Sequence, residues 1–131
     1  MRERLLNKEG RLEIASDLAL AYMNKASAVN DLGDTLGAIA LYDRVIEIRE
    51  RLVKRGQSEL LGDLAWAKGY RAETLIRVGE RTRGLNEGRE AIAILRTEAR
   101  RTGRADLKAV VEWLTDALTK AGHSISAPQS E

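Results

Sequence analysis

The chain is 131 residues long, with 44% apolar residues and a net charge of only +2, because 22 basic side chains nearly balance 20 acidic ones. This length predicts one compact domain with a buried core, and so small a net charge gives no reason to expect nucleic acid as the partner. The lack of cysteine excludes disulfides and thiol or zinc–cysteine chemistry, and no apolar stretch approaches the roughly 20 residues that cross a bilayer, so we expect a soluble, cytoplasmic protein.

The spacing of apolar residues predicts five helices separated by short glycine-containing turns. The chain is rich in Ala, Leu, Arg and Glu, which favour helices, and its one proline, Pro128, lies close to the end. Asp34 and Ser58 stand where the second and third helices need N-caps. The predicted helices cover residues 11–32, 34–54, 58–78, 85–102 and 105–121. The turns are expected near Gly10, Gly33, Gly56, Gly79 to Gly84, and Gly103.

The two ends of the chain are expected to differ from the helices between them. Residues 1–9 resemble the end of a later helix, so we interpret them as a helical stub, which either belongs to a larger protein or caps the first pair of helices. Residues 123–131 are rich in Ser and hold the proline, which predicts a disordered tail. We therefore expect a single helical domain over residues 1–122. In the first helix the residues predicted to be buried are Ile14, Leu18, Tyr22, Ala26 and Val29.

The chain repeats itself at an interval of 46 residues, the distance from Lys8 to Lys54. A fainter third copy places Trp113 47 residues after Trp66. Repeats of this kind bury their apolar faces against their neighbours, and such short turns predict antiparallel packing of alternating A and B helices in the order A-B-A-B-A. The residues that recur at the first interval are Lys8, Gly10, Glu13, Asp17, Leu18, Ala19, Ala21, Ala26 and Gly33.

The stretch from Tyr22 to Ile48 resembles a tetratricopeptide repeat. The residues that carry the resemblance are Tyr22, Ala26, the Gly33-Asp34 turn, Ala38, Tyr42 and Val45. The resemblance implies an all-α fold of antiparallel hairpins stacked as a short right-handed superhelix, with repeats longer than the usual 34 residues and similar to those of kinesin light chain. Residues 80–83 are interpreted as an insertion that shifts the register of the second copy. A closed helical bundle is the alternative fold.

In tetratricopeptide repeats the A helices line a concave groove that binds peptides, so the resemblance implies a protein–protein interaction scaffold. The partner would be a peptide or helix of another protein. For Trp66 and Trp113, core packing between helices is the competing role. The residues that would face the groove are Leu20, Met23, Ser27, Asn30, Trp66, Gly69, Glu73, Ile76, Arg77, Trp113 and Asp116.

Two other functions stay open at this stage. Unfinished helical repeats leave an apolar end face, which suits a homodimerisation or assembly element. Between residues 71 and 104, nine arginines stand against five glutamates, an excess that would suit arginine-mediated nucleic-acid binding. The competing interpretation is that the arginines coat an exposed helix and pair with Glu73, Glu80 and Glu87 at turn spacing.

No set of residues has the spacing of a catalytic, cofactor or metal site, so we expect a protein that is not an enzyme. His123 is the only histidine and has no partner at ligand or triad spacing. Asp17 and Asp63 recur at equivalent places, which we attribute to the first turns of two helices, where acids favour the helix dipole. The glycines at 84 and 88 lack the lysine of a phosphate-binding loop, and we interpret Gly88 as a close contact between helices.

Overall fold

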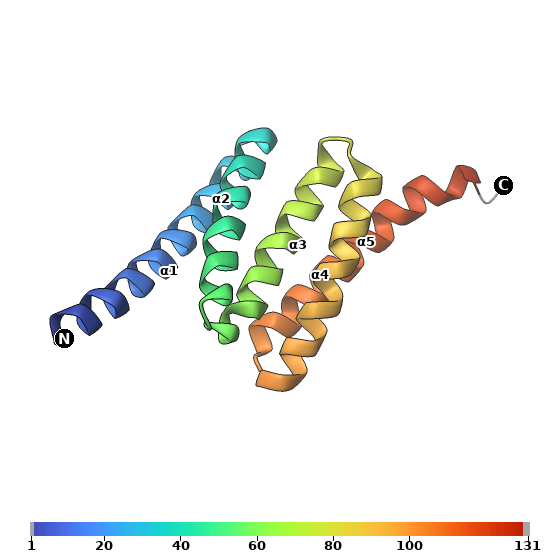
Figure 1. The fold of residues 1–131 in the computed structure, drawn as a ribbon. Helices are drawn as coiled ribbons and strands as arrows, with labels where there is room; N and C mark the ends of the chain where they lie inside the picture. Colours follow the sequence, from blue (N-terminus) through green and yellow to red (C-terminus); the bar gives the residue numbers. More distant parts are fainter. Residues whose placement is uncertain (1, 130–131) are drawn as a thin grey trace.

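The computed structural model describes residues 2–129, and the side chains of residues 10–122. Over that range the chain is helical apart from short turns and contains no strand, which confirms the predicted all-α class (Figure 1). A single 3₁₀ turn, η1 (Ser58–Leu60), precedes the third helix. The five α-helices are α1 (Arg2–Asp31), α2 (Thr35–Lys54), α3 (Leu61–Arg77), α4 (Arg81–Thr102) and α5 (Ala105–Gln129).

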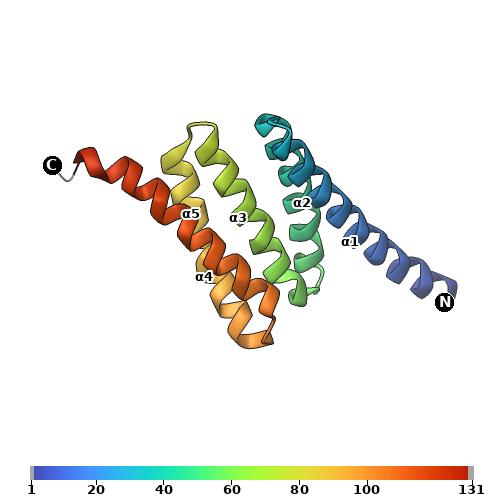
Figure 2. The same ribbon diagram turned by 180° about the vertical axis from the view of Figure 1, so that it is seen from behind.

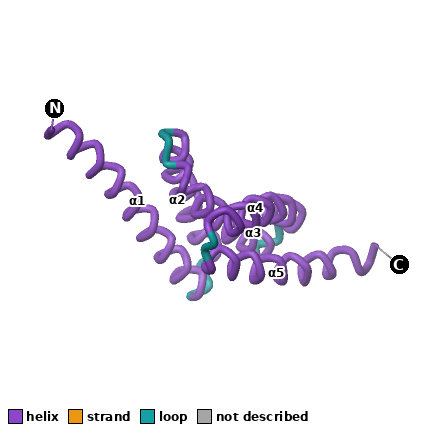
Figure 3. Tube along the Cα trace, turned by 90° about the horizontal axis from the view of Figure 1, so that it is seen from below, coloured by secondary structure: helices purple, strands orange, loops and turns teal. Residues whose placement is uncertain are grey.

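The helices pack in chain order as an open row. Each helix contacts the next one along the chain, and α5 also reaches back to α3. In Figure 1, α2 and α4 lie in front of α1 and α5, and the reversed view in Figure 2 brings α1 and α5 to the front. Figure 3 shows α1 and α5 diverging from the row toward the two chain ends. These two helices are not among the pairs that pack extensively within the described residues, so the row is not a closed bundle.

Two clusters of buried apolar side chains form the core. The first joins α1, α2 and the start of α3, with Tyr42 and Val45 at its centre. The second joins α3, α4 and α5 and includes Leu95 and Leu114, which are both fully buried. Trp66 packs against both clusters. Because burial of apolar surface drives folding, α3 is the helix that holds the two halves of the row together.

The turns at Gly33 and Gly79, which lie one repeat interval apart, are built in the same way, and the turn at Gly56 shares their hydrogen-bond pattern. Gly33 and Gly79 have positive φ angles of 94° and 97°, a region that glycine enters without strain. In each turn the residue after the glycine donates its amide back to a carbonyl of the preceding helix, which closes that helix. The matching hydrogen bonds run from Asp34 N to Val29 O and from Glu80 N to Leu75 O, both at 2.9 Å.

α4 begins at Arg81, four residues before the start that the sequence predicts. Arg81 opens α4 as Thr35 opens α2, at the interval of the repeat. The stretch Glu80–Arg83 is therefore no insertion, and this prediction was wrong. Gly84 stands where Ala38 stands in the first copy, so it is a small residue within a helix contact and does not belong to the turn.

Small residues set how closely the helices approach. A Cβ placed on Gly84 would lie only 2.7 Å from the carbonyl oxygen of Ala72. A Cβ on Gly88 would lie 2.8 Å from Leu118 Cδ1, which confirms the predicted close contact and assigns it to α5. Three alanines at helix contacts also have no exposed surface, namely Ala26, Ala38 and Ala72.

α1 runs without a break from Arg2 through Gly10, so the predicted turn at Gly10 and the separate stub over 1–9 were wrong. Gly10 lacks the positive φ of the turn glycines, and a glycine inside a helix costs only about 1 kcal/mol relative to alanine. Strong helix formers on both sides offset that cost.

The buried face of α1 also differs from the predicted one. α1 has 30 residues and α2 has 20, so the N-terminal part of α1 extends beyond its partner (Figure 1). Ile14 and Leu18, which were expected in the core, are 68% and 44% exposed. The buried positions are Ala19, Met23 and Ala26. Ile14 and Leu18 therefore lie on a face of α1 that α2 leaves largely exposed.

One predicted cap is confirmed and one is wrong. Asp34 Oδ1 accepts the amide of Gly37 at 2.9 Å and caps α2. Ser58 lies inside η1, and neither η1 nor α3 begins with a side-chain cap, because the 3₁₀ turn already carries the chain into the helix. At the other end, α5 continues to Gln129, past the predicted end at 121. Residues 123–129 of the predicted tail thus belong to α5, and 130–131 lie outside the described residues.

Candidate partner-binding site

The eleven residues predicted to line a groove come from α1, α3 and α5, and their accessibility differs. Met23 packs in the first core cluster, and a Cβ on Gly69 would lie 2.8 Å from Leu114 Cδ2. Their assignment to an accessible groove was therefore wrong, because neighbouring helices cover both. Five residues are exposed, namely Leu20, Ser27, Arg77, Trp113 and Asp116. Four are partly buried, namely Asn30, Trp66, Glu73 and Ile76.

Five of the eleven meet around one small hollow of about 170 Å³. We call it the aromatic pocket. Asp31, Tyr42 and Tyr70 complete its lining and were not predicted. The predicted residues that line it are Ser27 and Asn30 of α1, Glu73 and Arg77 of α3, and Trp113 of α5. The hollow is smaller than the roughly 300–1,000 Å³ typical of small-molecule sites, so it has room for about one side chain.

Aromatic rings from three helices form one wall of the aromatic pocket. The ring of Tyr70 stands edge-on to that of Tyr42 at 6.0 Å and to that of Trp113 at 4.9 Å, measured between centroids. Trp66 lies on the core side of Tyr70, at 6.2 Å. Edge-to-face pairs of this kind contribute about 0.5–1.5 kcal/mol each beyond burial. The rings therefore hold one another in fixed orientations.

The polar groups of the aromatic pocket are mainly hydrogen-bond acceptors. Glu73 forms an ion pair with Arg77 one turn later, and Asp31 adds a second carboxylate. The side-chain oxygen of Asn30 is buried and has no hydrogen-bond partner in the described chain. Because buried polar atoms are nearly always paired, this oxygen is a position that a donor from a ligand or a water would fill.

Tyr42 reports the electrostatic character of the aromatic pocket. Burial raises the pKa of Tyr42 to about 12, and the nearby Tyr70 and Glu73 act in the same direction. Both burial and neighbouring negative charge disfavour the tyrosinate anion. The carboxylates of Glu73 and Asp31 would also favour a positive group, whereas burial disfavours a charge of either sign.

This shift predicts an unusual alkaline titration. Of the three tyrosines, we expect one to ionise near pH 12, as followed by tyrosinate absorbance, and Tyr42→Phe to remove that step. Because the folded pKa lies above the unfolded value, the contribution to stability is complete below about pH 10 and is lost as the pH rises toward 12. Tyr22→Phe, the control, should leave the step in place. A wild-type titration in which every tyrosine ionises near pH 10 would contradict the prediction.

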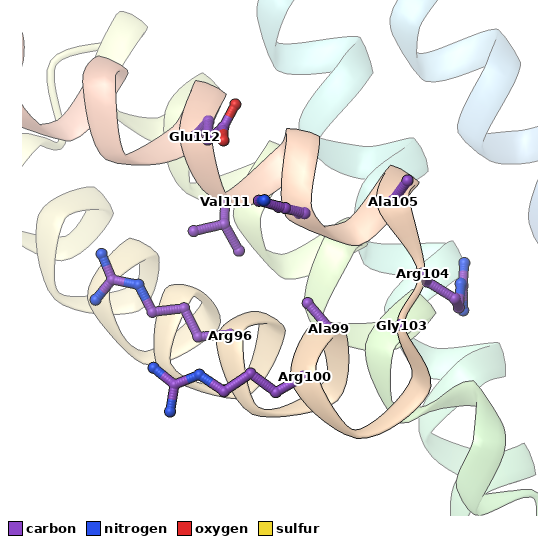
Figure 4. Close-up of a pocket in the computed structure, with 9 residues that line it drawn as sticks. Arg96, Ala99, Arg100, Gly103, Arg104, Ala105, Val111 and Glu112 are labelled. Carbon is purple, nitrogen blue, oxygen red and sulfur yellow. The ribbon is translucent and has the colours of Figure 1, made fainter.

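A second hollow, of about 600 Å³, lies between the C-terminal part of α4 and the start of α5 (Figure 4). We call it the basic cavity. Figure 4 shows Val111 of α5 pointing toward the part of α4 that carries Arg96. Glu112 is the one acid in the lining. The basic lining residues are Arg96, Arg100, Arg104 and Lys108, and the small or apolar ones are Ala99, Gly103, Ala105 and Val111.

The arginines between residues 71 and 104 fall into two groups. The predicted pairs at turn spacing are confirmed for Glu73 with Arg77 and for Arg83 with both Glu80 and Glu87. Five of the nine arginines form ion pairs within the described residues, namely Arg71, Arg77, Arg83, Arg101 and Arg104. The other four, Arg81, Arg89, Arg96 and Arg100, do not, and all belong to α4. Uncompensated positive charge is thus concentrated on this helix.

Of the two aspartates that recur at the repeat interval, only Asp63 lies in the first turn of a helix, as predicted. Asp63 lies in the first turn of α3 and binds Arg104 at 2.9 Å. Asp17 lies well inside α1, so the first-turn explanation fails for it. Among the residues that the structure describes, no group of three or more His, Cys, Asp or Glu is placed to hold a metal ion. The side chain of His123 lies outside the described ones.

No helix in the described range is long and apolar enough to cross a membrane. No family model matches the chain, and neither the curated proteins nor the solved structures give a match.

Proposed function

We propose that the chain is a protein-interaction module of the tetratricopeptide type that holds a segment of a partner protein against the face formed by α1, α3 and α5. The aromatic pocket carries this proposal. There, rings from three helices meet two carboxylates and the unpaired oxygen of Asn30. A fixed apolar wall beside unsatisfied acceptors is the arrangement that anchors one side chain of a bound peptide.

The chemistry of the aromatic pocket favours a basic side chain. A Lys or Arg head group carries only hydrogen-bond donors, which match the acceptors of Asn30, Asp31 and Glu73. A cation beside the faces of Tyr and Trp rings gains about 0.5–2 kcal/mol. Arg77 already occupies part of this surface through its ion pair with Glu73, so the incoming cation would share or replace that partner.

The surface around the aromatic pocket suits a peptide better than an isolated ion. Trp113 is 41% exposed, and Leu20, two turns before Ser27 on α1, is also exposed. Large apolar side chains on one face, next to a pocket that accepts one residue, are typical of protein interfaces. Two features support the tetratricopeptide type. The turns at Gly33 and Gly79 match each other, and small residues stand at the helix contacts, namely Ala26, Ala38, Ala72 and Gly84. The cysteine-free chain suits work in the cytoplasm.

The proposal is tested by selecting peptides from a random library displayed on phage against the whole chain and measuring the affinity of each selected peptide by fluorescence polarisation. We expect the selected peptides to share a basic residue next to an apolar one. Trp113→Ala should weaken their binding by about tenfold or more, because a buried aromatic anchor contributes about 2 kcal/mol or more.

The matched control is Leu36→Ala, which removes a more exposed apolar side chain, from α2, that does not line the aromatic pocket. Leu36 is 72% exposed, and this variant should bind the selected peptides as the wild type does. Thermal unfolding of both variants separates lost binding from lost structure. Peptides that bind the two variants equally well, or a selection that yields no binding peptide, would refute the proposal.

A further inference from the structure

The basic cavity holds three cations that the fold does not neutralise. Arg96, Arg100 and Lys108 form no ion pair within the described residues, whereas Arg104 is held by Asp63 at 2.9 Å and by Asp106 at 2.8 Å. These bonds raise the pKa of the Arg104 guanidinium and fix it at the edge of the hollow. Positive charge left uncompensated beside a concave surface attracts anions.

The basic cavity also has an apolar floor. Ala99 of α4 and Val111 of α5 lie between the charged side chains (Figure 4), and both pack against the second core cluster. Gly103 and Ala105 are small residues that line the hollow next to the turn between α4 and α5. A shallow trough between two neighbouring helices, with small residues at its base, has the shape in which a further helix packs.

From these features we infer that the basic cavity binds an acidic amphipathic helix of a partner protein. Its apolar side chains would cover Ala99 and Val111, and its carboxylates would pair with Arg96, Arg100 and Lys108. Arg96 and Arg100 are one turn apart on α4, so two acids one turn apart on the incoming helix can reach both. This surface is formed by α4 and α5 and is separate from the aromatic pocket.

The lining favours protein over nucleic acid. None of its residues is aromatic, and single-stranded nucleic acids are usually held by stacking of bases on aromatic rings. Glu112 at the rim would repel phosphates, whereas it can be avoided by a helix whose acids face only the arginines. An apolar floor offers contact area to Leu or Ala side chains and nothing specific to a sugar–phosphate backbone.

The test uses a fluorescent peptide of about 20 residues, long enough to form a helix. Its Leu and Ala residues lie on one face of that helix and its Glu residues on the other. We expect it to bind the whole chain and to bind Arg96→Glu/Arg100→Glu about tenfold more weakly, the loss of one or two charged contacts. Val111→Ser, which makes the floor polar, should also weaken binding. A control peptide with Gln in place of every Glu should bind the wild-type chain more weakly than the Glu peptide does.

The matched control is Arg81→Glu/Arg89→Glu. It changes two unpaired arginines of the same helix that do not line the basic cavity and alters the net charge by the same amount. Equal weakening by the two double variants would show attraction by net charge alone and overturn the inference. An oligouridylate that binds as tightly as the peptide and is equally sensitive to Arg96→Glu/Arg100→Glu would also overturn it, because the surface would then bind nucleic acid. Absence of peptide binding would do the same.

Discussion

Gly84→Ala is expected to lower the free energy of unfolding by about 1–3 kcal/mol, the usual cost of overpacking a close contact. An added Cβ would lie 2.6 Å from Ile76 Cγ1 and 2.7 Å from the carbonyl oxygen of Ala72. The isoleucine can rotate away, but the carbonyl belongs to the backbone of α3. α3 and α4 would therefore have to separate, which also disturbs the core on both sides of α3.

Gly10→Ala is the matched control, because it is the same substitution in a helix with free space. No atom lies within 4 Å of a Cβ built on Gly10, so we expect the usual gain of about 0.5–1 kcal/mol from replacing a helical glycine. Urea unfolding followed by circular dichroism gives both values. Effects of the same sign and size in the two variants would show that α3 and α4 do not approach as closely as the structure has them.

Gly10 also shows why a turn was predicted where the chain is helical. Gly10 recurs as Gly56 at the repeat interval, and Gly56 is a true turn residue with a φ of 102°. Gly10 is followed by Arg11 and Leu12 within a helix, whereas Gly56 is followed by Gln57 and the 3₁₀ turn. The identity of a glycine does not decide between these roles. The conformation depends on whether the neighbouring residues continue the helix.

The turns and the buried alanines were predictable because they follow from local rules. Positive φ at Gly33 and capping by Asp34 require only the residues on either side. The aromatic pocket was predicted in part, because the resemblance to tetratricopeptide repeats assigned Asn30, Glu73 and Trp113 to a groove, and all three line this pocket. Tyr42 was missed because it comes from α2, and a contact from a B helix depends on how two hairpins pack.

How deeply a side chain is buried depends on the neighbouring helices. The sequence of its own helix does not specify how those neighbours pack. Met23 was assigned to the groove and is buried by α2 and α3, whereas Ile14 was assigned to the core and is exposed. The two errors have different causes, because α2 and α3 cover the face that carries Met23 and leave the face that carries Ile14 exposed. Apolar periodicity identifies a face of a helix, and the packing of the neighbouring helices decides which part of that face is covered.

The two tryptophans at equivalent places in the repeat are expected to differ in their effect on stability. Trp66→Ala should lower the free energy of unfolding by about 3–5 kcal/mol, as for other large core residues, because its ring packs against both core clusters. Trp113→Ala should cost only about 1 kcal/mol, close to the value of one edge-to-face contact, because Trp113 is 41% exposed and touches Tyr70 at its edge. Urea unfolding of the two variants measures this difference directly.

The reason for the difference is position in the row. α3 has helices on both sides, so Trp66 packs between α2 and the α4–α5 pair. α5 is the last helix of the row (Figure 2), and Trp113 on it is 41% exposed. Trp66→Phe refines the test. It keeps most of the packing and removes the indole N–H, which is buried without a partner and costs free energy as long as it stays so. We therefore expect Trp66→Phe to cost much less than Trp66→Ala. Equal losses for Trp66→Ala and Trp113→Ala would mean that α3 does not join the two clusters, and that Trp113 is part of the core instead of the partner-binding face.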